Sequence, residues 1–470
     1  MMGRQLKTSF YAALAAGIVL RLWFITHIAR VTGDTLLYGN IARNWMQHDV
    51  YSFTSAGAPV PTLIRLPGYP LFLMACFRLF GVEHYAAVMY VQCVIDLCTC
   101  VLITALAGRL FGRRAAMAAL WLSALCPFMA TYTAAPLTEV LTLFTIALTF
   151  YSLERWRGGA LGFNRWLWVT AAAMAYSVLL RPEQGLLAAA VVTAMIWIAW
   201  RQAGSGRFAL TAILPVALAA ICVVLPLAPW AVRNWRTFHV FQPLAPRYAT
   251  DPGEEVPLGF QRWYRTWAID FASTEEVYWN YDSAPVEIGD LPGRAFDSND
   301  QYVRTEAILN TYNRDYNATP ALDARFEALA EERIHDDPIR YYVALPVARL
   351  LNMVFRPRAE MLEIPLEWWR WQKHPAEMTA LAVELGVLNL AYFVLGGVGL
   401  WRWRLSGWRP DPALVGAMLG FVVLRCLLLL TLDNSEPRYT LEFFPLLIVW
   451  GSFLFRSTQG QEKGNSLLRG

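Results

Sequence analysis

Ionisable residues recur in this chain at the ends of apolar runs. Because the loops between these runs alternate between the two sides of a membrane, all of these residues are expected on the same side. A carboxylate can accept or orient a proton, and the planar fork of arginine can hold two oxygens of one anionic group. Charges at membrane depth are costly, so by default they face a polar cavity or pair with one another, although snorkelling to the interface explains each one alone equally well. Their recurrence predicts a shared polar cavity. These residues are Asp34, Glu139, Arg181, Glu183, Arg233, Arg438 and Tyr439.

Asp34 opens the stretch GDTLLYGNIARNW, directly after the first apolar run. Leu37, Ile41 and Trp45 follow at helical spacing, which predicts a short helix lying along the membrane interface. A helix that starts at Thr35 would also take an aspartate as its N-cap. The sequence is compatible with a capping role and with a chemical role for Asp34.

The composition points to a membrane protein. The 470 residues are 56% hydrophobic and only 16% charged, where soluble domains carry about a quarter charged residues. The formal net charge of +4 is explained by arginines that set orientation, and no nucleic-acid partner is indicated. All seven cysteines lie in apolar stretches and are interpreted as small core residues.

Ten apolar runs come close to the roughly 20 residues that cross a bilayer. We therefore predict an all-α polytopic membrane protein. The predicted spans are 9–29, 84–106, 115–133, 137–153, 166–180, 185–200, 208–230, 378–400, 412–432 and 441–455.

Arginine and lysine gather in every second loop, which predicts that both chain termini are cytoplasmic. The protein is then a multi-pass protein of the inner (plasma) membrane whose polar cavity faces the outside. Four regions are predicted. They are a transmembrane module 1–230 with a first outer loop 30–83, an outer segment 231–377, C-terminal helices 378–456 and a cytoplasmic tail 457–470.

Two outer stretches have an unusual composition. In the first outer loop, Arg65 precedes a Pro-Gly-Tyr-Pro turn and an apolar piece, 69–80, which is too short to span and is interpreted as re-entrant or interfacial. In the outer segment an aromatic group suggests sugar stacking or headgroup contact. A charged helix then leads, after Pro338, into an apolar piece that is interfacial or a further span. The aromatic residues are Trp263, Tyr264, Trp267, Tyr278, Trp279 and Tyr281.

Taken in order, the motifs resemble those of the GT-C glycosyltransferases, in the branch of the dolichyl-phosphate-mannose protein mannosyltransferases and the bacterial lipid A aminoarabinose transferase. The resemblance implies a bundle of about ten to thirteen membrane helices, with interfacial helices in the first outer loop and a larger outer segment before the last three spans. The motifs are D-x-x-x-Y-x-x-x-A from Asp34, RLPGYPLF from Arg65, PLTE ending at Glu139, RPE at 181–183 and PRYTLEFFP from Pro437.

The resemblance implies transfer of one sugar from a polyprenyl-phosphate donor to a glycan, lipid or protein acceptor on the non-cytoplasmic face. Because the leaving group is a phosphate anion, its departure needs positive charge more than a general acid, and a single displacement with inversion is expected. Asp34 falls on the functional acid of the family. Arg438, Tyr439, Arg181 and Arg233 are then expected to bind the donor phosphate, with Arg65, Glu139, Tyr38 and Glu183 in support and Arg65 paired with Glu139.

The chain also departs from the family pattern. Thr35 stands where the protein mannosyltransferases carry a second acid, and there is no room for their β-trefoil domain. The aminoarabinose branch makes a divalent metal ion a candidate cofactor, yet the six histidines are scattered and no metal ligands can be assigned.

Two other functions were weighed against the transferase. A transporter or lipid flippase, the main alternative, needs ionisable groups near the midplane of the bilayer. Arg21 and Arg425 are the candidates, and neither has an evident acidic partner in the sequence. A phosphoethanolamine-type transferase needs a larger soluble domain with a metal cluster.

Overall fold

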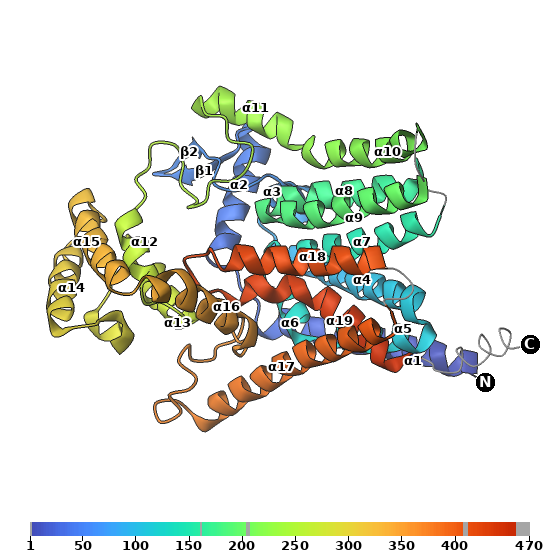
Figure 1. Cartoon of the computed structure of the whole chain (residues 1–470). Coiled ribbons are helices and arrows are strands. Elements are labelled where there is room, and N and C mark those ends of the chain that lie inside the picture. The colour runs from blue at the N-terminus through green and yellow to red at the C-terminus, as the bar shows by residue number, and fades with distance from the viewer. Residues whose placement is uncertain (1, 160–161, 204–206, 408–411, 457–470) are drawn as a thin grey trace, which may run out of the picture. The chain divides into compact units, whose positions relative to one another are not determined.

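The computed structural model describes residues 2–159, 162–203, 207–407 and 412–456 (Figure 1). The predicted cytoplasmic tail, 457–470, lies outside these residues. The described chain is mainly helical, with one two-stranded hairpin, which confirms the predicted all-α fold class of a multi-pass membrane protein. It divides into two compact units. The first is Met1–Pro252, Ala391–Val423 and Leu441–Gly470, and the second is Gly253–Leu390 with Leu424–Thr440.

The first unit contains most of the apolar helices. α17 (Ala376–Leu405) and α18 (Pro412–Leu429) contribute residues to both units. The other elements of the first unit are α1 (Met2–His27), α2 (Asp34–His48), β1 (Ser52–Ser55), β2 (Ala58–Pro61), α3 (Gly68–Phe80), α4 (Tyr85–Phe111), α5 (Arg113–Ala124), α6 (Pro127–Ala130), α7 (Glu139–Arg157), α8 (Arg165–Leu180), α9 (Gly185–Ala203), α10 (Arg207–Val224), α11 (Leu227–Phe238) and α19 (Phe444–Ser452).

The number of full-length spans is lower than predicted. By length and composition, six of the described helices can cross a membrane, or seven if α5 and the following helical turns, bent by 51°, form one span. Three predicted spans fall short for visible reasons. α7 carries charged residues at both ends, including Glu139 and Arg157, α8 has 16 residues, and α19 has nine.

α7 lies at the centre of the first unit, packed against α4 and α8, and α7 to α10 lie side by side (Figure 1). Small hydroxyl residues line the contact between α7 and α8. Thr145 donates to Ser177 at 3.0 Å, and Thr170 donates to Ser152 at 2.9 Å. Small side chains let two membrane helices approach closely, and hydroxyl bonds between them add to the packing.

The first outer loop contains a hairpin that the sequence analysis did not predict. β1 and β2 pair antiparallel, with Ser52 opposite Pro61. The two turn residues, Ala56 and Gly57, both have positive φ (47° and 81°), as a type I′ hairpin turn requires. Three residues of this loop, Tyr51, Leu63 and Leu66, pack on Trp230 of α11, so the loop has its own small core.

Arg21 has an acidic partner after all, which corrects the expectation from sequence. Its guanidinium forms an ion pair with Asp96 of α4 at 2.5 Å, and both side chains are fully buried. It also donates to the backbone oxygens of Gly17 and Ala124. This pair joins α1, α4 and α5, and its complete burial fits a structural role rather than the accessible charge that a transporter needs.

The second unit is built on an aromatic core. Trp263, Tyr264, Trp267 and Tyr281 are at most 6% exposed and belong to one core with Phe260. These four residues therefore stabilise the unit and are neither sugar platforms nor interfacial anchors, whereas Trp279 is 42% exposed. The longer helices of this unit are α12 (Leu258–Arg265), α14 (Asn299–Tyr312), α15 (Pro320–Asp336) and α16 (Leu345–Phe355).

The apolar piece after Pro338 forms a π-helical stretch, Arg340–Ala344, that runs into α16, and it is not among the described helices that are long and apolar enough to cross a membrane. It is therefore not an eleventh full span.

Arg425, the other arginine named for a transporter, lies in the second unit. It donates to the backbone oxygen of Tyr439 at 3.3 Å.

Candidate active site

Asp34 and Arg65 form an ion pair at the start of α2. Nη2 of Arg65 lies 2.9 Å from Oδ1 of Asp34, and the two side chains remain 22% and 28% exposed, respectively. Helix α2 begins at Asp34 itself, and its N-cap position is Gly33, with φ +53° and no side-chain capping bond. The capping role is therefore wrong for Asp34, and its carboxylate is directed to an arginine in a partly open position.

The backbone next to Arg65 is held by close packing. Tyr51 donates its hydroxyl to the carbonyl oxygen of Arg65 at 2.9 Å. Three residues later, a Cβ on Gly68 would lie 2.5 Å from the backbone of Leu179, so only glycine fits there without a shift. Tyr176 donates to the Gly68 carbonyl at 3.1 Å. These contacts bring the Arg65 loop to the end of α8, directly before Arg181.

Tyr38 lies one helical turn after Asp34. The guanidinium carbon of Arg65 is 5.8 Å from the centre of its ring, and the ring meets Tyr69 edge-on at 5.1 Å. Burial raises the pKa of the Tyr38 hydroxyl to about 12, Arg65 lowers it, and Asp34 raises it. Arg181 and Glu139 also act on this hydroxyl. Tyr38 therefore stays protonated at neutral pH, within electrostatic range of both charge clusters.

A second charge cluster surrounds Arg181. Its Nη2 lies 2.8 Å from Glu139, its Nη1 lies 3.2 Å from Glu442 and 3.9 Å from Glu183, and its Nε donates to the Thr138 hydroxyl at 2.9 Å. The side chains of Glu139 and Glu442 are at most 3% exposed. With two buried carboxylates against it, Arg181 is already largely neutralised and is a weaker phosphate ligand than the sequence suggested.

Glu442 and Gln184 are members of this cluster that the sequence analysis did not assign. Gln184 donates to Glu442 at 2.7 Å. Glu442 lies within the PRYTLEFFP motif, and Gln184 directly follows the RPE motif. An acid inside an apolar stretch was the signal that could have found Glu442.

The ion pairs shown for Arg65 and Glu139 differ from the pair expected between them. Arg65 contacts Asp34, and Glu139 contacts Arg181. A hydrogen-bonded bridge nevertheless joins the Arg65 side of the site to the Glu139 side. Tyr69 donates to the buried Gln92 at 2.7 Å, and Gln92 donates to the backbone oxygen of Ala135, four residues before Glu139, at 2.8 Å.

Arg233 fastens the first outer loop to α11. It donates to the backbone oxygens of Thr62 at 2.7 Å and Tyr51 at 2.6 Å. Its guanidinium carbon also lies 5.2 Å from the ring centre of Trp230. Its contacts are those of a structural clamp, which makes a role as phosphate ligand less favourable than the sequence suggested.

Arg438 and Tyr439 belong to the second unit, where both contact the buried Glu436. Arg438 forms an ion pair with Glu436, and the Tyr439 hydroxyl donates to it at 3.0 Å. Glu436 is a further residue that the sequence analysis did not assign. The roles of Arg438 and Tyr439 at the donor phosphate stay a prediction.

The described residues do not assemble the ligands of a metal site. Within the ranges given above, no group of three or more His, Cys, Asp or Glu side chains could hold a metal ion. This donor set does not fit the divalent ion that the resemblance suggested, and no step of the chemistry below is assigned to one.

Comparison with known proteins identifies related folds. Residues 61–230 match the model of the dolichyl-phosphate-mannose-protein mannosyltransferase family. No curated protein sequence matches the chain. The fold is similar to that of the oligosaccharyltransferase of Archaeoglobus fulgidus tethered with an acceptor peptide, with 13% identity, a TM-score of 0.52, and coverage of 96% of this chain and 49% of that one.

Two further structures are similar. One is the A. fulgidus oligosaccharyltransferase AglB with an inhibitory peptide and a dolichol-phosphate, at 12% identity and a TM-score of 0.50, covering 96% of this chain and 50% of that one. The other is ArnT from Cupriavidus metallidurans bound to undecaprenyl phosphate, at 14% identity and a TM-score of 0.39, covering 96% and 79%. This chain thus spans about half the length of the archaeal enzymes. The predicted resemblance to the GT-C superfamily is confirmed by the matched segment and the shared fold.

Proposed function

We propose that this protein is a membrane glycosyltransferase that moves one sugar from a polyprenyl-phosphate donor to an acceptor on the non-cytoplasmic face of the inner membrane. The observation that carries the proposal is the partly exposed pair of Asp34 and Arg65. The match of residues 61–230 to a mannosyltransferase family model supports it, because Arg65, Glu139 and Arg181 all lie in that segment.

Asp34 is the proposed catalytic residue. With 28% of its side chain exposed, its carboxylate can reach an acceptor hydroxyl, whereas the carboxylate of Glu139 is 2% exposed. Asp34 would take the hydroxyl proton, or orient the hydroxyl, as the oxygen attacks the anomeric carbon. The bond from that carbon to the phosphate oxygen breaks, and a single displacement of this kind inverts the anomeric centre.

Arg65 is proposed to act on both sides of this reaction. It orients Asp34 through the 2.9 Å contact, and its planar guanidinium can hold phosphate oxygens as negative charge builds on the leaving group. The exposed face of α3, which includes Leu79 at 76% exposure and Phe80 at 50%, is a candidate surface for the apolar tail of the carrier.

The proposal is tested in the strain from which the gene has been deleted. Mass spectrometry of its lipids, polysaccharide and envelope proteins is expected to show the loss of one monosaccharide and the accumulation of one polyprenyl-linked sugar. The wild-type gene should restore the sugar and Asp34→Asn should not. Asp49→Asn, which changes an exposed acid at the end of the same helix, is the matched control and should restore it. Neither loss nor accumulation in the deletion strain would overturn the proposal.

A further inference from the structure

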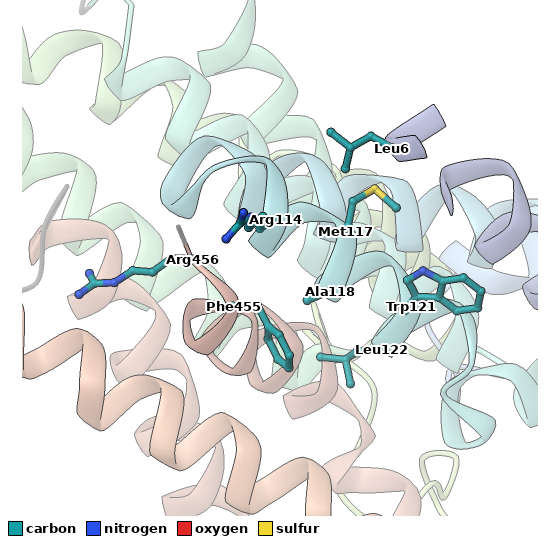
Figure 2. A pocket seen from close by; sticks show the side chains of 8 residues that line it. All are labelled: Leu6, Arg114, Met117, Ala118, Trp121, Leu122, Phe455 and Arg456. Atoms are coloured by element: carbon teal, nitrogen blue, oxygen red, sulfur yellow. The ribbon is translucent and has the colours of Figure 1, made fainter. Parts of the chain in front are cut away.

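A groove of about 670 Å³ lies at the far end of α1 from Asp34. It is bordered by α1, α5 and the last described residues of the chain, and Figure 2 shows the eight side chains around it. Six of them are apolar or aromatic. In this view the two arginines, Arg114 and Arg456, lie on the side of the group away from Trp121, and the guanidinium of Arg456 points away from the other side chains. The lining residues are Leu6, Arg114, Met117, Ala118, Trp121, Leu122, Phe455 and Arg456.

The position of the groove sets it apart from the candidate active site. Leu6 and His27 are near opposite ends of α1, and the helix rises about 32 Å from one to the other. That is about the thickness of the hydrocarbon core. The groove is thus at the membrane face that carries the basic loops, while Asp34 lies just beyond the other end of α1.

The walls of the groove are firmly packed. Trp121 donates its indole N–H to Ser9 of α1 at 3.0 Å, and Met117 and Trp121 also pack on the small core between these helices. Arg456 follows the last helical turn, and its guanidinium carbon lies 4.1 Å from the ring centre of Phe453. The arginines are therefore presented by fixed elements.

The charge of the groove is uncompensated in the described part of the chain. No acidic residue lines it, and neither Arg114 nor Arg456 has an ion-pair partner among the described residues. Glu154, a buried acid near the end of α7, contacts Arg109 and Arg157 instead. Arg114 also lies in the first turn of α5, where the positive end of the helix dipole adds to the attraction for an anion.

The length of the groove along α5 matches the thickness of the hydrocarbon region of one bilayer leaflet. From Arg114 to Leu122, α5 rises about 12 Å, against about 15 Å for half the hydrocarbon core. A phosphate at the arginines would therefore leave an acyl chain lying along Met117, Ala118 and Trp121. Basic pockets between membrane helices on the cytoplasmic side are the kind that hold anionic lipid headgroups.

We propose that this groove binds one anionic glycerophospholipid of the cytoplasmic leaflet, with its phosphate at Arg114 and Arg456 and an acyl chain along α5. The site is separate from the proposed transfer reaction and does not depend on it.

The test uses the full-length protein, stripped of lipid in detergent and titrated with phosphatidylglycerol or with phosphatidylcholine of the same acyl chains. Native mass spectrometry counts the bound lipid. Phosphatidylglycerol should bind preferentially, and the double variant Arg114→Gln/Arg456→Gln should weaken it roughly 10- to 30-fold. The matched control is Arg113→Gln/Arg404→Gln, which removes two exposed arginines outside the groove, and it should bind as the wild type does.

A variant that fills the groove tests the contribution of its apolar lining to lipid binding. Ala118→Phe should reduce phosphatidylglycerol binding while both arginines remain, and thermal unfolding identifies any variant that fails to fold. Equal binding of the two lipids, or equal effects of the two double variants, would overturn the proposal. Displacement of the lipid by millimolar inorganic phosphate would also overturn it, because the site would then select an anion without its acyl chain.

Discussion

The two charge clusters of the first unit differ in exposure more than in composition. Each places a carboxylate 2.8 to 2.9 Å from an arginine. The Asp34 and Arg65 side chains are 28% and 22% exposed, whereas Glu139 and Arg181 are 2% and 11% exposed. An exposed pair adds at most about 1 kcal/mol to stability and can exchange its partner for a substrate. A buried ion pair is costly to break, so the pair of Glu139 and Arg181 is expected to stabilise the fold.

The largest effect is expected at Asp34. Asp34→Asn removes the proton acceptor and should lower the rate of sugar transfer by about 10²- to 10⁴-fold, with little change in Tm. The measurement is transfer by purified protein in lipid, using the donor that accumulates in the deletion strain. A rate within threefold of wild type would remove Asp34 from the chemistry.

Glu139→Gln should act on stability instead. It leaves Arg181 buried with one carboxylate fewer, which is expected to cost about 3 kcal/mol. Thermal unfolding in detergent should show a Tm several degrees lower. Glu83→Gln, in an ion pair with Arg43 whose side chains are 39% and 30% exposed, is the control and should leave Tm nearly unchanged. Equal Tm values for the two variants would mean that the buried and the exposed ion pair contribute equally to stability.

Gly68→Ala tests whether the packing between α3 and α8 positions Arg65. The added Cβ would meet the backbone of Leu179 at 2.5 Å, and such overpacking costs typically 1 to 3 kcal/mol. Both Tm and transfer should fall. Gly185→Ala, where nothing lies within 4 Å of the added Cβ, is the control. A loss of stability with full activity would show that the Arg65 loop is positioned by other contacts.

Arg65→Lys should be milder than the loss of Asp34. Lysine keeps the charge but loses the planar fork, and the loss of one bond to a charged group corresponds to about a tenfold lower rate. Arg43→Lys, on the same helix as Asp34 and in an exposed pair, provides the matched control. An unchanged transfer rate in Arg65→Lys would show that only the positive charge of Arg65 is needed, and not its planar guanidinium.

Tyr38→Phe should have the smallest effect. The ring contacts with Arg65 and Tyr69 persist, and only the hydroxyl is removed. Because its pKa is raised to about 12, the hydroxyl keeps its proton throughout pH 6 to 9. The pH profile of transfer should therefore have the same shape in the variant. A limb of the profile that disappears in Tyr38→Phe would contradict this assignment.

Local patterns in the sequence were sufficient for the helical membrane class and for the short helix at Asp34. Hydrophobic run length and arginine placement are properties of short segments. Partner choice depends on long-range packing, and it is here that the sequence predictions failed. Asp34 binds Arg65, Arg181 binds Glu139 and Glu442, and Arg21 binds Asp96.

The interpretation of the aromatic residues in the outer segment was wrong for a related reason. Trp263 and Tyr264 are adjacent in sequence to polar residues, so their local pattern resembles an exposed surface. Helices α12 and α15 pack on each other and bury these rings. The spacing of aromatic residues cannot distinguish a sugar platform from the core of a small domain, because both need large flat rings.

The central claim is that exposure divides the two clusters into a catalytic pair and a structural one. Its most direct test compares Asp34→Asn with Glu139→Gln in one preparation, measuring the transfer rate per folded molecule. Asp34→Asn should be at least about 100-fold slower at an unchanged Tm. Glu139→Gln should stay within a few-fold of wild type at a lowered Tm. The reverse outcome, a stable but inactive Glu139→Gln beside an active Asp34→Asn, would contradict the account.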